Sequence, residues 1–120
     1  MIRILIVDDD PEFRSMLASA LMTEGFEVTT SVNGLQALHA VAREHPNLVL
    51  LDYMMPVLDA PGFVERLGNM DDHPAVIAMS GKAISRAELE EVGALAFLPK
   101  PFDLDKLREQ IRIHSDRLAS

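Results

Sequence analysis

The fold of this chain is decided by the stretch Leu48-Val49-Leu50-Leu51-Asp52-Tyr53-Met54-Met55-Pro56. It begins with four consecutive aliphatic residues, a pattern that predicts a short strand buried on both faces, as in a parallel sheet. The run ends abruptly at the carboxylate of Asp52. Because a strand holds a side chain more rigidly than a loop does, an acid at the end of a buried strand is a candidate functional group.

The rest of the chain alternates between strand and helix patterns. Further strands are predicted at residues 2–7, 26–31, 75–79 and 94–98. Apolar residues at helical spacing, capping residues and prolines predict helices between Asp10 and Gly25, between Asn33 and Pro46, over 61–67 and 84–92, and after the cap Asp103. Such alternation is typical of βαβ units, so we expect one α/β domain over residues 1–120, with a five-stranded, doubly wound parallel sheet and helices on both faces.

Composition excludes several classes of function. The chain has no cysteine, which rules out disulfides and thiolate metal sites. Its formal charge of −8 argues against direct binding of nucleic acid, since phosphate contacts need clustered Lys and Arg. No apolar run is long enough to cross a membrane and no basic-then-apolar leader is present, so we expect a cytoplasmic protein with no membrane partner.

Polar side chains follow the ends of four predicted strands. They are Asp8 and Asp9 after the first, Asp52, Ser80, and Lys100. Ligands of doubly wound sheets bind beyond the carboxyl ends of the strands, so these groups should converge on one edge. Taken singly, each is more often a turn residue, a helix cap or a solvated cation. Their combination at one edge is what indicates a site.

Three carboxylates in one cleft repel one another. A like-charged pair about 4 Å apart costs roughly 1 kcal/mol in water and about 4 kcal/mol at an effective dielectric constant of 20. Lys100 can offset one charge, and a divalent cation two more. All-oxygen ligation suits Mg²⁺ or Mn²⁺, whereas the lack of cysteine and of clustered histidine disfavours zinc.

The chemistry that this set permits is phosphoryl transfer onto a carboxylate, which forms an aspartyl phosphate. That reaction needs charge neutralisation and alignment more than proton transfer. Asp52 stands alone at its strand end and is the expected nucleophile, while the paired acids Asp8 and Asp9 suit the metal. Ser80 and Lys100 would then meet the oxygens of the transferred phosphoryl group.

Four segments in this order resemble the receiver domains of response regulators in two-component signalling, and the resemblance covers essentially the whole chain. The segments are Ile-Leu-Ile-Val-Asp-Asp-Asp-Pro (4–11), Leu-Val-Leu-Leu-Asp-Tyr-Met-Met-Pro (48–56), Ala-Met-Ser (78–80) and Leu-Pro-Lys-Pro-Phe (98–102). The resemblance implies a flavodoxin-like fold with strand order 2-1-3-4-5. It also implies a cis peptide bond between Lys100 and Pro101.

The resemblance assigns roles to individual residues. Asp52 would be the phosphorylated residue, and Asp8, Asp9, Asp52 and the backbone carbonyl of Met54 would bind Mg²⁺. Ser80 would bind the phosphoryl group, and Ser80 with Phe97 would form the switch. A histidine kinase or a histidine phosphotransfer protein would be the donor. The chain would catalyse only its own phosphorylation and dephosphorylation.

The output implied by the resemblance is a change in partner affinity. The surface formed by the helix at 84–92, the strand at 94–98 and the last helix would bind an effector protein or domain, or a second copy of the chain. The sequence also departs from the family. Val57 and Ala60 stand where glycine is common, Phe97 lacks the hydroxyl of the tyrosine often found there, and Lys82 adds a cation near Ser80.

Three other functions fit parts of the pattern. An aspartate-dependent phosphatase of the haloacid dehalogenase type needs Asp-x-Asp-x-Thr, and residues 8–12 supply the acids but not the threonine. A flavodoxin-like cofactor carrier needs a hydroxyl-rich loop after the first strand, where three acids would repel the FMN phosphate. An unphosphorylated adaptor of the same fold has no use for the complete set of site residues found here.

Overall fold

The computed structural model describes residues 2–55, 57–69, 74–114 and 118, and in it the chain forms one parallel sheet. The strands are β1 (Arg3–Val7), β2 (Glu27–Ser31), β3 (Leu48–Asp52), β4 (Ala75–Ser80) and β5 (Ala96–Pro99). Their order across the sheet is β2-β1-β3-β4-β5, with all neighbours parallel. The predicted order is confirmed, and β2, the least apolar strand, lies at an edge.

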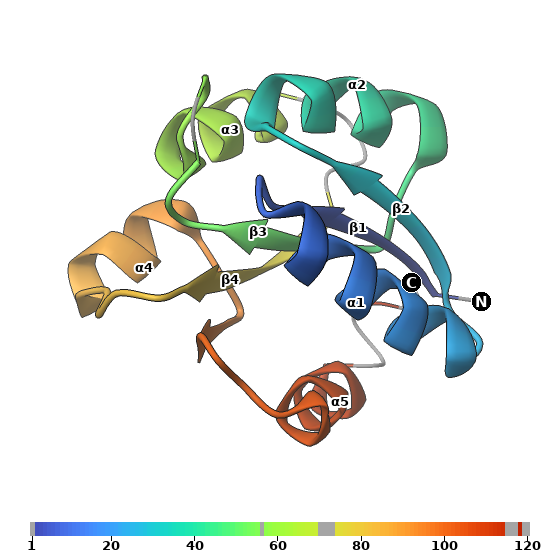
Figure 1. The fold of residues 1–120 in the computed structure, drawn as a ribbon. Coiled ribbons are helices and arrows are strands. Elements are labelled where there is room, and N and C mark those ends of the chain that lie inside the picture. The colour runs from blue at the N-terminus through green and yellow to red at the C-terminus, as the bar shows by residue number, and fades with distance from the viewer. Residues whose placement is uncertain (1, 56, 70–73, 115–117, 119–120) are drawn as a thin grey trace.

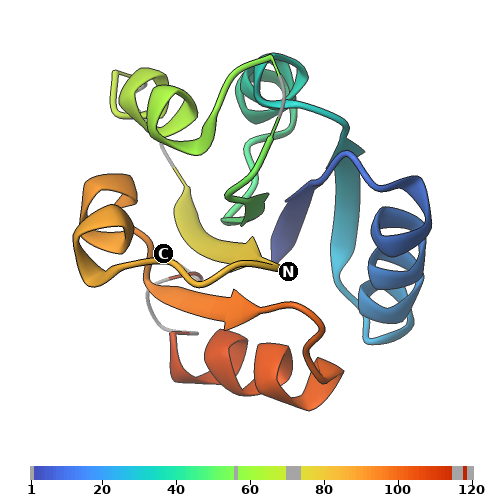
Figure 2. The ribbon, with the colours of Figure 1, turned by 60° about the vertical axis from the view of Figure 1, so that its left-hand side comes forward.

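The helices are α1 (Pro11–Thr23), α2 (Gly34–Glu44), α3 (Ala60–Leu67), α4 (Arg86–Val92) and α5 (Leu104–Ile113). Figure 1 shows α1 and α5 on one face of the sheet and α2 and α3 on the other. Figure 2, a view turned from that of Figure 1, shows the sheet between these two layers of helices, with α4 beside α3. The doubly wound α/β fold predicted from the sequence is therefore confirmed.

Side-chain alternation along the strands builds two cores. Ile4 and Ile6 of β1, Leu48 and Leu50 of β3, and Leu98 of β5 face α1 and α5. The residues between them, such as Leu5 and Val49, face α2 and α3. Leu48 to Leu51 are all 0% exposed, as the uninterrupted apolar run predicts for a strand covered on both faces.

Helix caps agree with the sequence at most ends. Asp10 caps α1 by accepting from the backbone N–H groups of Glu12 and Phe13, and Asn33 caps α2 by accepting from that of Gln36. The Gln36 side chain accepts from the N–H of Val32 and not from that of Asn33, so the Asn33-x-x-Gln36 spacing does not form a complete capping box. Asp103 occupies the N-cap position of α5, but its side chain makes no capping hydrogen bond there. The predicted side-chain cap is wrong at this helix.

The loop after β3 packs against the start of α2. A Cβ atom on Gly34 would lie 2.7 Å from the backbone oxygen of Leu58, so only glycine allows this approach. Val57, one residue earlier in the loop, has a φ of 73°. That left-handed conformation favours glycine, and a β-branched side chain is strained in it. Ala60 instead begins α3 and is buried.

Within the described part of the chain, no helix is both long and apolar enough to cross a membrane.

Replacing Val57 by glycine should stabilise the protein. The Val57 side chain is 74% exposed, so it buries little surface that could offset its backbone strain. We expect Val57→Gly to raise the free energy of unfolding by about 1 kcal/mol, measured by urea denaturation. Val57→Ala keeps a Cβ atom without the branching and should fall between the two. A glycine variant less stable than the wild type would show that the loop is not strained at this residue.

Candidate functional site

The structure brings Asp8, Asp9 and Asp52 together beyond the ends of β1 and β3. One carboxylate oxygen of each lies within 4.8 Å of the others. The register explains why Asp8 and Asp52 meet. Val7 of β1 pairs with Leu51 of β3, and these two acids are the next residues in the sequence. Asp8 is fully buried and Asp52 is 6% exposed, whereas Asp9 is exposed. The predicted convergence of the three acids is confirmed.

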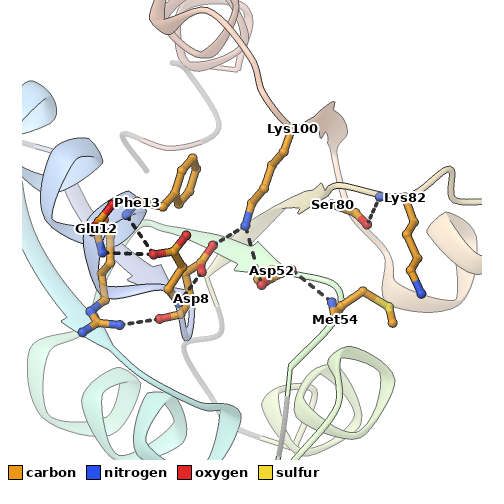
Figure 3. A network of polar contacts seen from close by, with 10 residues as sticks. Asp8, Glu12, Phe13, Asp52, Met54, Ser80, Lys82 and Lys100 are labelled. Atoms are coloured by element: carbon orange, nitrogen blue, oxygen red, sulfur yellow. Dashed lines mark hydrogen bonds and ion pairs between the residues drawn. The ribbon is translucent and has the colours of Figure 1, made fainter.

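Lys100 enters the same edge from the end of β5. Its Nζ lies 2.6 Å from Oδ2 of Asp8 and 3.6 Å from Oδ2 of Asp52 (Figure 3). The backbone N–H of Lys100 donates to the Ser80 carbonyl over 2.7 Å, and the following bond to Pro101 is cis, as the resemblance implied. The Lys100 side chain is only 21% exposed, so its ammonium points inward and not to bulk solvent.

Alternation along the strands explains why these charges meet. Ile6, Leu50 and Leu98 face α1 and α5, so the residues two positions later, Asp8, Asp52 and Lys100, come out on the same side. Asp8, Asp52 and Lys100 therefore lie on the same face of the sheet as this core, just beyond it at the carboxyl ends of the strands.

Asp8 is held by hydrogen bonds on both carboxylate oxygens. Its Oδ1 accepts from the backbone N–H of Asp10 over 2.9 Å, and its Oδ2 accepts from Lys100. Its backbone carbonyl accepts from Nη1 of Arg14 over 2.7 Å. Arg14 was not predicted from the sequence, because an arginine in the first turns of a helix looks like any solvated cation. It fixes the turn between β1 and α1.

Asp52 is less well compensated than Asp8. Its Oδ1 accepts from the backbone N–H of Met54 over 3.1 Å, and its Oδ2 faces Lys100. Burial raises the pKa of Asp52 above its usual range, and the charges of Asp8 and Asp9 raise it further. Lys100 and the Met54 N–H lower this pKa but do not cancel the effect of burial. The surroundings of Asp52 therefore disfavour the ionised form of its carboxyl group.

Ser80 lies at the end of β4 and is 1% exposed. Its Oγ accepts from the backbone N–H of Lys82 over 3.0 Å (Figure 3). The hydroxyl is thus engaged with its own loop. Met54 exposes 51% of its surface beside Asp52, and Phe97 is half-buried on β5 opposite Ala78. Ser80 and Met54 lie at the predicted carboxyl edge of the sheet. Phe97 lies within β5, the strand next to that of Ser80.

A contact that the sequence did not reveal joins Asp52 to α4 through its neighbour. The Tyr53 hydroxyl donates to Oε2 of Glu88 over 3.1 Å. The other oxygen of Glu88 accepts from the backbone N–H of Ser85, in a capping box at the start of α4. The Ser85-x-x-Glu88 spacing signals the capping box, but nothing in the sequence signals its contact with Tyr53.

The arrangement suits a small, highly charged ligand. Three carboxylates against one ammonium leave two excess negative charges, which equals the charge of one divalent cation. The donors are all oxygen atoms, as Mg²⁺ prefers. A cavity of about 560 Å³ lies at the opposite edge, near Asn47 and Ala75 at the amino ends of β3 and β4, and takes no part in the acidic site.

Comparison with known proteins gives one family. The model of the response regulator receiver domain matches residues 4–112. Sporulation initiation phosphotransferase F of Bacillus subtilis (strain 168) is 38% identical over 112 residues, covering 92% of this chain and 90% of that protein. The probable transcriptional regulator ycf27 of Cyanophora paradoxa is 39% identical over 111 residues, covering 92% of this chain and 46% of that protein. The chain thus spans about half the length of that regulator.

Solved structures agree. The receiver domain of the sensor histidine kinase PA1611 from Pseudomonas aeruginosa PAO1, with a magnesium ion coordinated in its active-site cleft, has a TM-score of 0.85 and 26% identity, covering 99% of this chain and 98% of that one. The response regulator TrrA from Thermotoga maritima, in complex with Mg²⁺ and BeF, has a TM-score of 0.83 and 30% identity, covering 94% and 98%. By sequence and by fold, this chain belongs to the response regulator receiver domain family of two-component systems.

Proposed function

We propose that the chain, as a single receiver domain over residues 1–120, accepts a phosphoryl group on Asp52. The observation that carries this proposal is the meeting of Asp8, Asp9 and Asp52 with the ammonium of Lys100 at one edge of the sheet. Of the two buried acids, Asp52 has the less compensated carboxylate, whose Oδ2 lacks the close ion pair of Asp8. A carboxylate of this kind is suited to attack phosphorus.

The residues present fit a magnesium ion. Asp8, Asp9 and Asp52 would hold it with their carboxylates, and the backbone carbonyl of Met54 would complete the protein ligands. Mn²⁺ would fit the same oxygen donors. When bound, the ion neutralises charge on the phosphoryl oxygens and aligns them for transfer.

The transfer itself is a simple exchange of bonds. A carboxylate oxygen of Asp52 forms a bond to phosphorus while the bond between phosphorus and the donor's imidazole nitrogen breaks. The donor is a histidine kinase or a histidine phosphotransfer protein, and the electron pair stays on its imidazole, which takes up a proton. Lys100 lies 3.6 Å from Asp52 and would donate to an oxygen of the transferred group.

In this proposal the chain is not an enzyme acting on a separate substrate. It would catalyse only its own phosphorylation and its own dephosphorylation. Phosphotransfer is named for a relative that matches over most of its own length, the sporulation protein of Bacillus subtilis. That similarity supports a phosphorelay role for this chain.

The output would be a change on the surface formed by α4, β5 and α5. Ser80 would exchange its bond to the Lys82 N–H for one to the phosphoryl group, and Phe97 would repack. A phosphoryl group can shift the two states only through contacts that differ between them. The surface would then bind an effector protein or domain, or a second copy of the chain, while the net charge of −8 disfavours direct contact with nucleic acid.

Phosphorylation can be tested with a small phosphodonor and Mg²⁺, followed by intact-mass measurement. The wild type should gain the mass of one phosphoryl group, stable in acid and labile in base. Asp52→Asn should gain none, because its amide cannot form the acyl phosphate. Glu65→Gln, which removes an exposed carboxylate on α3, is the matched control and should behave as the wild type. Labelling of Asp52→Asn equal to that of the wild type would place the acceptor elsewhere.

The raised pKa of Asp52 also predicts a pH dependence of stability without metal. The folded protein holds the proton of this carboxyl more tightly than the unfolded chain does. Between the ordinary aspartate pKa and the raised one, the free energy of unfolding therefore falls as the pH rises. Asp52→Asn lacks this loss and should be the more stable protein at neutral pH.

Urea denaturation in EDTA, from pH 4 to pH 8, measures this difference. The curves of wild type and Asp52→Asn should diverge as the pH rises, whereas Glu65→Gln should follow the wild type. Parallel curves for the wild type and Asp52→Asn would show that Asp52 is not destabilised by its surroundings.

A further inference from the structure

We propose that Phe13 is a positioning residue for Lys100, holding its ammonium inside the acidic cleft. The Nζ atom of Lys100 lies 4.3 Å from the centroid of the Phe13 ring, over its face. Figure 3 shows the Phe13 ring beside the end of the Lys100 side chain. The face of an aromatic ring carries partial negative charge and attracts a cation at this distance.

The ring gives the ammonium a third neighbour besides Asp8 and Asp52. A lysine ammonium has three N–H donors. One is used by Asp8 at 2.6 Å, and Asp52 lies on a second side at 3.6 Å. The Phe13 ring lies 4.3 Å from the same Nζ and covers part of its surface. Because the Lys100 side chain is only 21% exposed, this attraction is weakened little by solvent.

The ring is itself held in place. Asp10 accepts from the backbone N–H groups of Glu12 and Phe13, over 3.0 and 3.3 Å, which fixes the first turn of α1. The Phe102 ring packs edge-on against the Phe13 ring, with centroids 5.9 Å apart and planes at 84°. Both rings also pack on the core beneath α1 and α5. These contacts orient the Phe13 ring toward Lys100.

The position of the Lys100 ammonium affects the proposed phosphoryl transfer, on which this inference rests. Lysine is flexible, and holding it in one conformation costs rotamer entropy. Without the ring face, the ammonium would spend more time in solvent and less beside Asp52. Its contact with the incoming phosphoryl oxygens would then be made less often, and transfer would slow. Leucine could fill the same apolar space but would offer no negative face.

The kinetic test measures the rate of Asp52 phosphorylation by a small phosphodonor at saturating Mg²⁺. We expect Phe13→Leu to slow this rate about two- to five-fold, and Phe13→Tyr, which keeps the ring face, to restore it. Fluorinated phenylalanines at position 13 keep the shape of the ring while weakening its negative face, so they should slow the reaction stepwise with each fluorine. In a Lys100→Met background, Phe13→Leu should have no further effect.

The spectroscopic test does not depend on phosphorylation. The side-chain protons of Lys100 lie over an aromatic face, so their NMR signals should be shifted upfield, and Phe13→Leu should abolish the shift. A missing shift in the wild type, or rates unchanged by Phe13→Leu and by fluorination, would overturn the inference. A wild type that shows the shift but accepts no phosphoryl group would refute the proposed function, and the role of Phe13 with it, while leaving the contact itself intact.

Discussion

The functional site depends on the negative charge that is gathered at the carboxyl edge of the sheet. Asp8 and Asp52 come directly after buried apolar runs, Ile4 to Val7 and Leu48 to Leu51, and burial of a carboxylate costs several kcal/mol unless partners compensate it. Asp8 has such partners in Lys100 and the Asp10 N–H. Asp52 shares Lys100 at a longer distance, and its pKa is raised. The imbalance marks Asp52 as the acid whose charge is left for another partner to satisfy.

Lys100 connects most of the parts of this edge. Its ammonium contacts acids from the ends of β1 and β3 and the ring of a residue in α1, and Phe102, two residues further on, braces that ring. Moving the ammonium toward a new anion would change all of these contacts at once. A single charged group thus links Asp52 to α1 and, through the Phe13 ring, to the segment before α5.

Much of this could be predicted from the sequence, because the pattern is strong where burial is complete. The apolar run at 48–51 predicts a strand covered on both faces, and the rule for ligand sites in parallel sheets then predicts that Asp8, Asp52 and Lys100 meet at one edge. Contacts that depend on side-chain direction were not predictable. The sequence shows Phe13 only as one apolar position of a helix. The contact of Arg14 with the Asp8 carbonyl and the bond from Tyr53 to Glu88 cannot be predicted from the spacing of these residues. The capping of α5 by Asp103 failed for the same reason, since a favoured residue type does not guarantee the hydrogen bond.

Asp52 and Tyr53, which are neighbours in the sequence, place their side chains on opposite faces of the sheet. Successive strand residues point to opposite sides. Asp52 faces the layer of α1 and α5, where the charges gather, and Tyr53 packs on the core beneath α2 and α3 and bonds to Glu88 of α4. Within α4, all of whose residues the structure describes, Val92 alone is buried.

A helix with so little buried surface opens or shifts at low cost, so its capping box and the Tyr53 bond carry a large share of what holds it. Tyr53 adjoins Asp52 in the backbone, so one residue separates the carboxylate from a direct contact with α4. This short route from the charged face to the weakly packed helix supports the placement of the output surface on α4.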